Sequence, residues 1–386
     1  MTQPSRRKGW CPSAHRPMLS GDGLVVRIRP VRARLTAVQA LGLADAAGRF
    51  GNGILEITRR GNLQLRGVAE AAHAPLLAAL DALALVPPDA AAEGRLNLLC
   101  APLWAPGDDT DRIATALEAL PYRAPALPAK FGVAVDAGEA RALADIPADI
   151  RIERAAEGGL ILRADGATAG RPVTAADAPQ AALDLARWFL ASGGAAAGRM
   201  RRHLAAGARL PAGHGAEPAA CAAPLRPGPT SVGPAGAARG LALGLPFGQT
   251  TAPALSRVIA ATGARALRIT PWRLLVLEGA AAAPLPADFL GPAEARLLAV
   301  DACPGAPACS SASVATRALA RSLAPRIAGS LHVSGCAKGC ARSAPADWTL
   351  IGRSGYFDIV RDGDVAAAPV ATGLSAAEAL AFFEGR

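Results

Sequence analysis

The feature that most constrains the fold of this chain is a weak internal repeat. One copy spans residues 21–68 and the other spans residues 240–279. In each copy a strand-like apolar stretch is followed by a helix-like segment, a glycine turn and further strand. Each copy also carries a related polar motif, Ile57-Thr58-Arg59-Arg60 in one and Ile269-Thr270-Pro271-Trp272-Arg273 in the other. The repeat therefore predicts two equivalent supersecondary units.

The segments around the repeats give the domain organisation. A chain of 386 residues is too long for one ordinary core. A mixed segment of strands and helices follows each copy, and an Ala-, Gly- and Pro-rich stretch separates the halves. We predict a first half-domain over 1–80, an α/β domain over 81–210, a loose linker over 211–239, a second half-domain over 240–290 and a cysteine-containing domain over 291–386.

Composition and charge restrict the partners. No apolar run reaches the roughly 18 residues that a membrane helix needs, so we expect no membrane partner. Arg6-Arg7-Lys8 is not followed by an apolar segment, which predicts no signal peptide and a cytoplasmic location. The net charge is +10, but the basic residues are scattered and aromatics are only 4%, which disfavours nucleic acid. The arginines favour instead a polyanionic small molecule, because guanidinium groups pair bidentately with carboxylates.

Four of the seven cysteines predict a metal centre. Cys303, Cys309, Cys336 and Cys340 follow the spacing C-x5-C, 26 residues, C-x3-C. Thiolate ligands suit iron–sulfur clusters and zinc, but zinc ribbons usually carry tighter C-x2-C pairs. The wide, Gly- and Pro-rich loops favour a 4Fe-4S cluster, with zinc and unrelated buried cysteines as the alternatives. An odd number of cysteines without a secretion signal disfavours a disulfide framework.

Together with the cysteines, three further segments resemble the sulfite/nitrite reductase superfamily. Residues 57–68 read ITRRGNLQLRGV and are similar to the family's I-T-T-R-Q-N-x-Q-x-R-G strand. Residues 127–131 read LPAKF, like the family's L-P-x-K-F, and residues 97–100 read NLLC, like the tail of R-N-V-x-C. The resemblance covers nearly the whole chain. It implies a pseudo-twofold α+β fold of two ferredoxin-like half-domains and two larger α/β domains, with a cluster beside a tetrapyrrole pocket.

Within this superfamily the chain resembles the precorrin-3B synthase branch. It is short for a sulfite reductase, and residues 332–341 read HVSGCAKGCA where reductases typically read T-G-C-P-N-G-C. The resemblance implies an oxygen-dependent monooxygenase of aerobic cobalamin biosynthesis, which converts precorrin-3A to precorrin-3B by hydroxylation and γ-lactone formation. It implies molecular oxygen and an unidentified electron donor as partners, and the branch is associated with an additional non-haem iron.

The expected substrate-binding residues lie on both halves of the chain. Arg60 matches the family's anion-binding arginine, and Gln64 and Arg66 would share its strand face if the strand is continuous. Lys130 matches a family lysine that holds a small oxyanion, and Arg273 lies on the equivalent strand of the second half. His332 either hydrogen-bonds a cluster sulfur or the substrate, or ends a strand.

Two alternatives remain at this point. The first is a sirohaem-dependent sulfite or nitrite reductase. Gly132 stands where reductases carry a second lysine, which disfavours this alternative because a small dianion needs its full cationic clamp. The second is an electron-transfer or structural metal-binding protein, which would not need the segments around Arg60 and Lys130.

Overall fold

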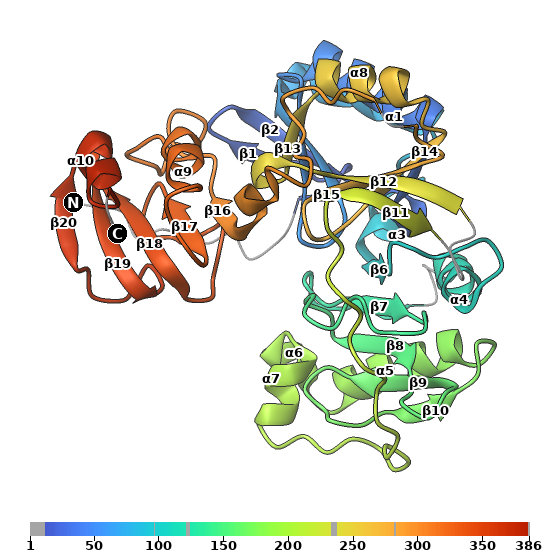
Figure 1. The fold of residues 1–386 in the computed structure, drawn as a ribbon. Helices are drawn as coiled ribbons and strands as arrows, with labels where there is room; N and C mark the ends of the chain where they lie inside the picture. Colours follow the sequence, from blue (N-terminus) through green and yellow to red (C-terminus); the bar gives the residue numbers. More distant parts are fainter. Residues whose placement is uncertain (1–11, 96, 121–123, 233–237, 282, 385–386) are drawn as a thin grey trace.

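The computed structural model describes residues 12–95, 97–120, 124–232, 238–281 and 283–384, which form four five-stranded sheets. In Figure 1 two of these sheets lie together near the centre of the molecule, and each of the other two forms a separate lobe. The segment Arg6-Arg7-Lys8, on which the predicted location depends, lies outside the described residues. Among the residues that are described, no helix is long and apolar enough to span a membrane.

The two central sheets come from the repeated units and exchange one strand. The first has the order β1 (Met18–Ser20), β2 (Gly23–Ile28), β5 (Leu63–Val68), β4 (Ile54–Ile57) and β13 (Gln249–Thr251). The second has the order β11 (Gly228–Val232), β12 (Ala238–Gly244), β15 (Leu274–Glu278), β14 (Ala266–Ile269) and β3 (Arg34–Thr36). Strand β13 of the second half thus pairs with β4 of the first, and β3 of the first pairs with β14 of the second. One hydrophobic core therefore contains buried residues of both copies.

The main helix of each half-domain begins with the same kind of N-terminal cap. Thr36 ends β3, and its hydroxyl accepts the Gln39 amide at 3.2 Å to cap α1 (Ala37–Phe50). Thr251 ends β13, and its hydroxyl accepts the Ala254 amide at 3.3 Å to cap α8 (Ala252–Thr262). Such caps satisfy amides that have no partner in the first helical turn. Helices α1 and α8 pack side by side (Figure 1), and α2 (His73–Ala82) packs beside α1.

The predicted continuous strand through Arg60 is wrong. Strand β4 ends at Ile57 and β5 begins at Leu63, with a tight turn between them. The Thr58 amide donates to the Asn62 carbonyl at 2.8 Å, and Gly61 has a φ of +63°. A glycine adopts such a left-handed conformation without the steric cost that other residues incur. Arg60 therefore lies in a hairpin turn, whereas Gln64 and Arg66 lie on β5.

The two outer sheets have one topology, which extends the repeat to the whole chain. One consists of β6 (Leu98–Cys100), β7 (Val133–Asp136), β8 (Ile150–Arg154), β9 (Leu160–Ala164) and β10 (Arg171–Val173). The other consists of β16 (Val300–Ala302), β17 (Leu331–Ser334), β18 (Ala346–Arg353), β19 (Tyr356–Gly363) and β20 (Ala371–Leu374). In each, the first three strands are parallel and the last two are antiparallel. We call them the first α/β domain and the cysteine domain.

Helices pack on these two sheets. Those of the first α/β domain and the segment leading to it are α3 (Ala90–Arg95), α4 (Asp109–Glu118), α5 (Ala178–Ala191), α6 (Gly194–Ala197) and α7 (Met200–Ala205). Those of the cysteine domain are α9 (Arg317–Leu323) and α10 (Ala376–Ala381). Each sheet has its own buried apolar cluster beneath its helices. The boundaries between the five segments expected from the sequence stay predictions.

The described part of the segment expected to be a loose linker, residues 211–232 and 238–239, contains regular backbone pairing. Its residues pair with the first α/β domain through the bridges Gly170–Ala216, Ala155–Pro218 and Arg141–Cys221. Strand β11 then begins within it and joins the second half-domain. These contacts use backbone groups, which every residue type except proline can both donate and accept. Low side-chain periodicity therefore did not prevent regular pairing.

Candidate functional site

The four clustered cysteines lie in two loops that leave neighbouring strands of the cysteine domain. Cys303 directly follows β16, and Cys336 comes two residues after β17. The Gly335 amide donates to the Cys303 sulfur at 3.1 Å, which ties the two loops together. Desolvation raises the pKa of the Cys340 thiol, and the neighbouring Cys336, Cys303 and Cys309 raise it further. The four thiols are therefore close enough to interact electrostatically.

Glycines and hydroxyl groups shape these loops. A Cβ on Gly335 would lie 2.6 Å from the Ala312 side chain, and one on Gly305 would lie 2.7 Å from the Thr316 hydroxyl. The Thr316 hydroxyl also donates to the Cys303 carbonyl at 2.5 Å. The loops thus approach each other more closely than larger residues would allow.

Four thiols that influence one another, with a backbone amide that donates to one sulfur, are the donor chemistry that an iron–sulfur cluster uses, although their side chains are not gathered closely enough to hold a metal in this structure. The six cysteines in the described part of the chain are all free. Within the same described residues, no group of three or more His, Cys, Asp or Glu side chains is arranged to hold a metal ion.

Three arginines from separate parts of the chain meet one carboxylate beside the cysteine loops. Arg59 Nη2 lies 3.1 Å from Asp301 Oδ1, and Arg342 Nη1 lies 3.1 Å from Asp301 Oδ2. Arg273 Nη2 lies 3.5 Å from Asp301 Oδ1, and its Nη1 donates to the Val300 carbonyl at 2.6 Å. We call Arg59, Arg273, Arg342 and Asp301 the arginine junction. It joins both half-domains to the strand that leads into Cys303.

His332 lies beside the arginine junction on the adjacent parallel strand. Its register partner is Asp301, its exposed fraction is 0%, and neither ring nitrogen has a hydrogen-bond partner within the described residues. Burial lowers the pKa of His332 to about 4. Asp301 and Asp364 act to raise this pKa, and Arg342 and Arg59 lower it further. The imidazole is therefore neutral at neutral pH.

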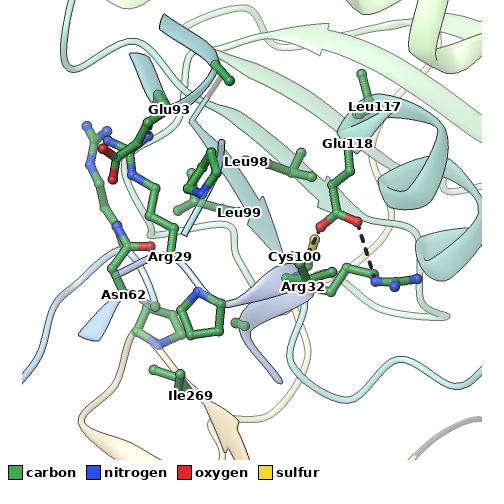
Figure 2. A pocket seen from close by; sticks show the side chains of 18 of the residues that line it. Arg29, Arg32, Asn62, Glu93, Leu98, Leu99, Cys100, Leu117, Glu118 and Ile269 are labelled. Atoms are coloured by element: carbon green, nitrogen blue, oxygen red, sulfur yellow. Dashed lines mark hydrogen bonds and ion pairs between the residues drawn. The ribbon is translucent and has the colours of Figure 1, made fainter. Parts of the chain in front are cut away.

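A cavity of about 300 Å³ lies where the half-domains meet the first α/β domain. Figure 2 shows Arg29 and Glu93 together at one side of it, and Arg32, Cys100 and Glu118 at the other. The Arg32 amide donates to Glu118 Oε1 at 3.1 Å. Burial raises the pKa of Glu118 and also that of Cys100, so the thiol stays protonated and unreactive.

The structure divides the predicted substrate-binding residues into three places. Arg60 lines the cavity, and its Nη2 donates to the Lys130 carbonyl at 2.7 Å, which brings these two residues together. Arg273 belongs to the arginine junction. Gln64 and Arg66 do not line the cavity.

Gln64 and Arg66 instead belong to a network of charged and polar groups. Arg66 binds Asp22 through two hydrogen bonds of 2.7 and 2.9 Å, and it also contacts Glu56 at 3.3 Å. Gln64 donates to Glu56 at 3.3 Å, and Arg317 of α9 contacts the same carboxylate at 3.1 Å. Burial acts to lower the pKa of Arg66, but Glu56 and Asp22 raise it, so it stays charged. This network connects the first half-domain to the cysteine domain.

Sequence reasoning did not select Arg59, Arg342 or Asp301. Signals for them exist in the sequence. Asp301 comes two residues before Cys303, Arg342 comes two residues after Cys340, and Arg59 stands where the family strand reads threonine. The sequence could not predict that these residues contact one another, because the three arginines reach Asp301 from different domains.

Comparisons with known proteins agree with this architecture. A model of the nitrite/sulfite reductase ferredoxin-like half domain matches residues 16–83. A Sinorhizobium sp. protein named precorrin-3B synthase is 36% identical over 401 aligned positions, which cover 94% of this chain and 84% of that protein. The structure of the Mycobacterium tuberculosis NirA protein superposes with a TM-score of 0.58 at 18% identity, covering 91% of this chain and 77% of that one. The predicted pseudo-twofold reductase-like fold is confirmed.

Proposed function

The chain belongs to the precorrin-3B synthase family and is an oxidoreductase, and on this premise we propose that it converts precorrin-3A to precorrin-3B in aerobic cobalamin biosynthesis. The proposed reaction uses molecular oxygen and an electron donor to hydroxylate the tetrapyrrole and close an acetate side chain into a γ-lactone. The observation that carries the proposal is the identity to a relative of that name over nearly the whole chain. Arg60 at the cavity and the arginine junction between the domains support a polycarboxylate substrate.

The proposed metal ligands are Cys303, Cys309, Cys336 and Cys340, which would hold a 4Fe-4S cluster. When bound, such a cluster would supply single electrons. The chain contributes the thiolates and the Gly335 amide that donates to Cys303. Hydrogen bonds of this kind to the sulfurs tune the reduction potential of a cluster.

The proposed substrate contacts are Arg60, Lys130 and Arg273. Arg60 lines a cavity of about 300 Å³, which is at the lower limit for small-molecule sites. The cavity therefore suits one edge of a tetrapyrrole, with its carboxylate arms, rather than the whole macrocycle. Gln64 and Arg66 are proposed to act at a distance, by fixing the first half-domain against α9 through Glu56.

The test is anaerobic purification followed by iron and acid-labile sulfide analysis, acid-acetone extraction of haem, and assay with precorrin-3A. We expect iron and sulfide without extractable sirohaem, and formation of precorrin-3B only when oxygen is supplied. Near-stoichiometric sirohaem with reduction of sulfite or nitrite would instead establish the reductase alternative. Stoichiometric zinc without iron would overturn the cluster assignment.

A further inference from the structure

Within the described residues, the ion pairs of the arginine junction join three cations to one carboxylate. Arg59, Arg273 and Arg342 face the single carboxylate of Asp301, so the formal charge of the four groups is 3 − 1 = +2. Asp301 is 8% exposed at its side chain, and Arg273 and Arg342 are 18% and 23% exposed. Excess charge at partly buried positions is unfavourable unless an ion of opposite sign is supplied.

The contacts within the junction leave capacity for another carboxylate. Arg59 and Arg273 share one oxygen of Asp301, so neither forms the bidentate pair that guanidinium and carboxylate groups favour. Burial lowers the pKa of Arg273, Asp301 acts to raise it, and Arg59 and Arg342 lower it again. The three cations therefore repel one another, and Asp301 only partly offsets this repulsion.

His332 gives a second, independent indication of a missing group. Both of its ring nitrogens are buried without a partner in the described residues, next to Asp301 on the adjoining strand. A buried polar group without a partner is destabilising, so such groups need a specific explanation. Asp301 is the register partner of His332 on the neighbouring parallel strand, which places the imidazole beside the arginine junction.

We propose that Arg59, Arg273 and Arg342 form a carboxylate-binding subsite for the tetrapyrrole, in which Asp301 takes the place of a substrate carboxylate when no substrate is bound. This inference rests on the proposed function for the identity of the ligand. A substrate carboxylate pairs with Arg59 and relieves the surplus positive charge. No covalent step is involved.

The hydrogen bonds and exposure of the three arginines indicate which of them responds to the ligand. Arg342 is held by the Pro345 carbonyl at 2.8 Å, and Arg273 is held by the Val300 carbonyl at 2.6 Å. Arg59 has a side chain that is 58% exposed. Arg59 therefore moves from Asp301 to the ligand, whereas Arg273 and Arg342 stay in place as a fixed positive surface.

The experiment measures binding of uroporphyrin I, a stable octacarboxylate porphyrin, to the anaerobically purified full-length protein by fluorescence quenching. Arg59→Gln is compared with wild type and with Arg353→Gln. Arg353 is a matched control, because its side chain is 53% exposed and pairs with Asp358 at 2.7 Å in the β18–β19 hairpin of the cysteine domain. We expect Arg59→Gln to weaken binding about tenfold and to reduce its dependence on salt, and Arg353→Gln to bind like wild type.

Asp301→Asn tests whether a ligand carboxylate replaces Asp301 as the partner of Arg59, which we call the exchange. Because this substitution removes the internal competitor, we expect uroporphyrin I to bind several-fold more tightly than to wild type. Unchanged or weaker binding to a folded Asp301→Asn protein overturns the exchange. Wild-type affinity in Arg59→Gln, or an equal loss in Arg353→Gln, overturns the subsite, and this arm decides the matter if Asp301→Asn does not fold.

Turnover of precorrin-3A separates this inference from the proposed function. If wild type forms no precorrin-3B, but Arg59→Gln weakens uroporphyrin binding, the subsite is supported and the proposed reaction is wrong. If wild type forms precorrin-3B and Arg59→Gln has unchanged kinetics, the proposed reaction is supported and the subsite is wrong.

Discussion

Arg59 and Arg60 are adjacent in the chain, yet their guanidinium groups bond to different domains. Arg59 pairs with Asp301 of the cysteine domain at 3.1 Å, and Arg60 donates to the Lys130 carbonyl beside the first α/β domain at 2.7 Å. The equivalent turn of the second half divides in the same way. Trp272 packs against the first α/β domain, and Arg273 pairs with Asp301. The two hairpin turns are therefore the places where the half-domains contact both outer domains.

Arg60→Gln tests the cavity side of this arrangement. A neutral side chain cannot make the charge-assisted pair with a substrate carboxylate, so we expect KM for precorrin-3A to rise about tenfold with a smaller change in kcat. Steady-state kinetics measure both. Arg187→Gln, on the solvent side of α5 with a 47% exposed side chain, is the control and should leave both constants unchanged. Unchanged kinetics in Arg60→Gln would exclude this residue from the substrate site.

Cys336→Ser tests the cysteine centre. A hydroxyl is a harder and less acidic ligand than a thiol, so we expect the variant to lose bound iron, acid-labile sulfide and turnover together. The control is Cys221→Ser, because Cys221 is exposed and lies in the segment that pairs with Arg141. Normal iron, sulfide and turnover in Cys336→Ser would contradict the proposed cluster ligands.

Much of the fold could be predicted because its signals are local. The second copy of the repeat predicts a helix followed by a glycine turn, and α8 lies there with a glycine at its end that adopts a φ of +62°. The strand exchange could not be predicted in this way. Strands β3 and β13 have three residues each, and their partners lie in the other half of the chain. No pattern within so short a segment specifies a distant partner.

In the candidate site, too, local features could be predicted from the sequence and contacts between distant segments could not. Spacing alone groups the four cysteines, and the motifs select Arg60 and Lys130, which the structure brings together. The sequence also suggested that Arg66 would share a face with Arg60. The turn at Gly61 separates them, and Asp22 and Glu56 neutralise Arg66 within the chain. The turn at Gly61 is therefore the reason that Arg60 and Arg66 do not share a strand face as predicted.

Asp165→Asn tests a buried ion pair of the first α/β domain. The Arg151 and Asp165 side chains are 4% and 9% exposed and lie 3.0 Å apart. Removing one partner leaves a buried charge without its ion pair, so we expect the free energy of unfolding of the first α/β domain to fall by about 3–5 kcal/mol. Chemical denaturation measures it. Asp184→Asn, in an exposed pair on α5, should cost less than about 1 kcal/mol.

The pH dependence of the same pair has a definite sign. Burial acts to raise the pKa of Asp165, but Arg201 and Arg151 lower it below its ordinary value. The carboxylate therefore contributes stability above its unfolded pKa of about 3.9, and this contribution is lost as the pH falls through the lower folded pKa. The stability difference between wild type and Asp165→Asn should accordingly shrink below about pH 4. A difference that stays constant from neutral pH into this range would show that the carboxylate is not ionically paired.

His332→Leu tests whether the buried imidazole lacks a partner in the ligand-free protein. Since both ring nitrogens are unpaired in the described structure, an apolar side chain of similar size should leave stability unchanged or raise it by about 1–3 kcal/mol. His203→Leu is the contrasting control. His203 bonds to the Ser192 hydroxyl at 2.7 Å and packs against Phe189, so its replacement should be destabilising.

The pH profile gives a second readout for His332. Its folded pKa of about 4 lies below the ordinary value of 6.5, mainly because of burial, so the unfolded chain takes up the proton first. Wild-type stability should therefore fall as the pH decreases from about 6.5 to about 4, and His332→Leu should lack this component. Thermal unfolding across this range, with iron content measured in each sample, separates the effect from loss of metal. If His332→Leu is as destabilised as His203→Leu and keeps the wild-type pH profile, the imidazole has a partner within the protein and cannot mark an incomplete ligand site.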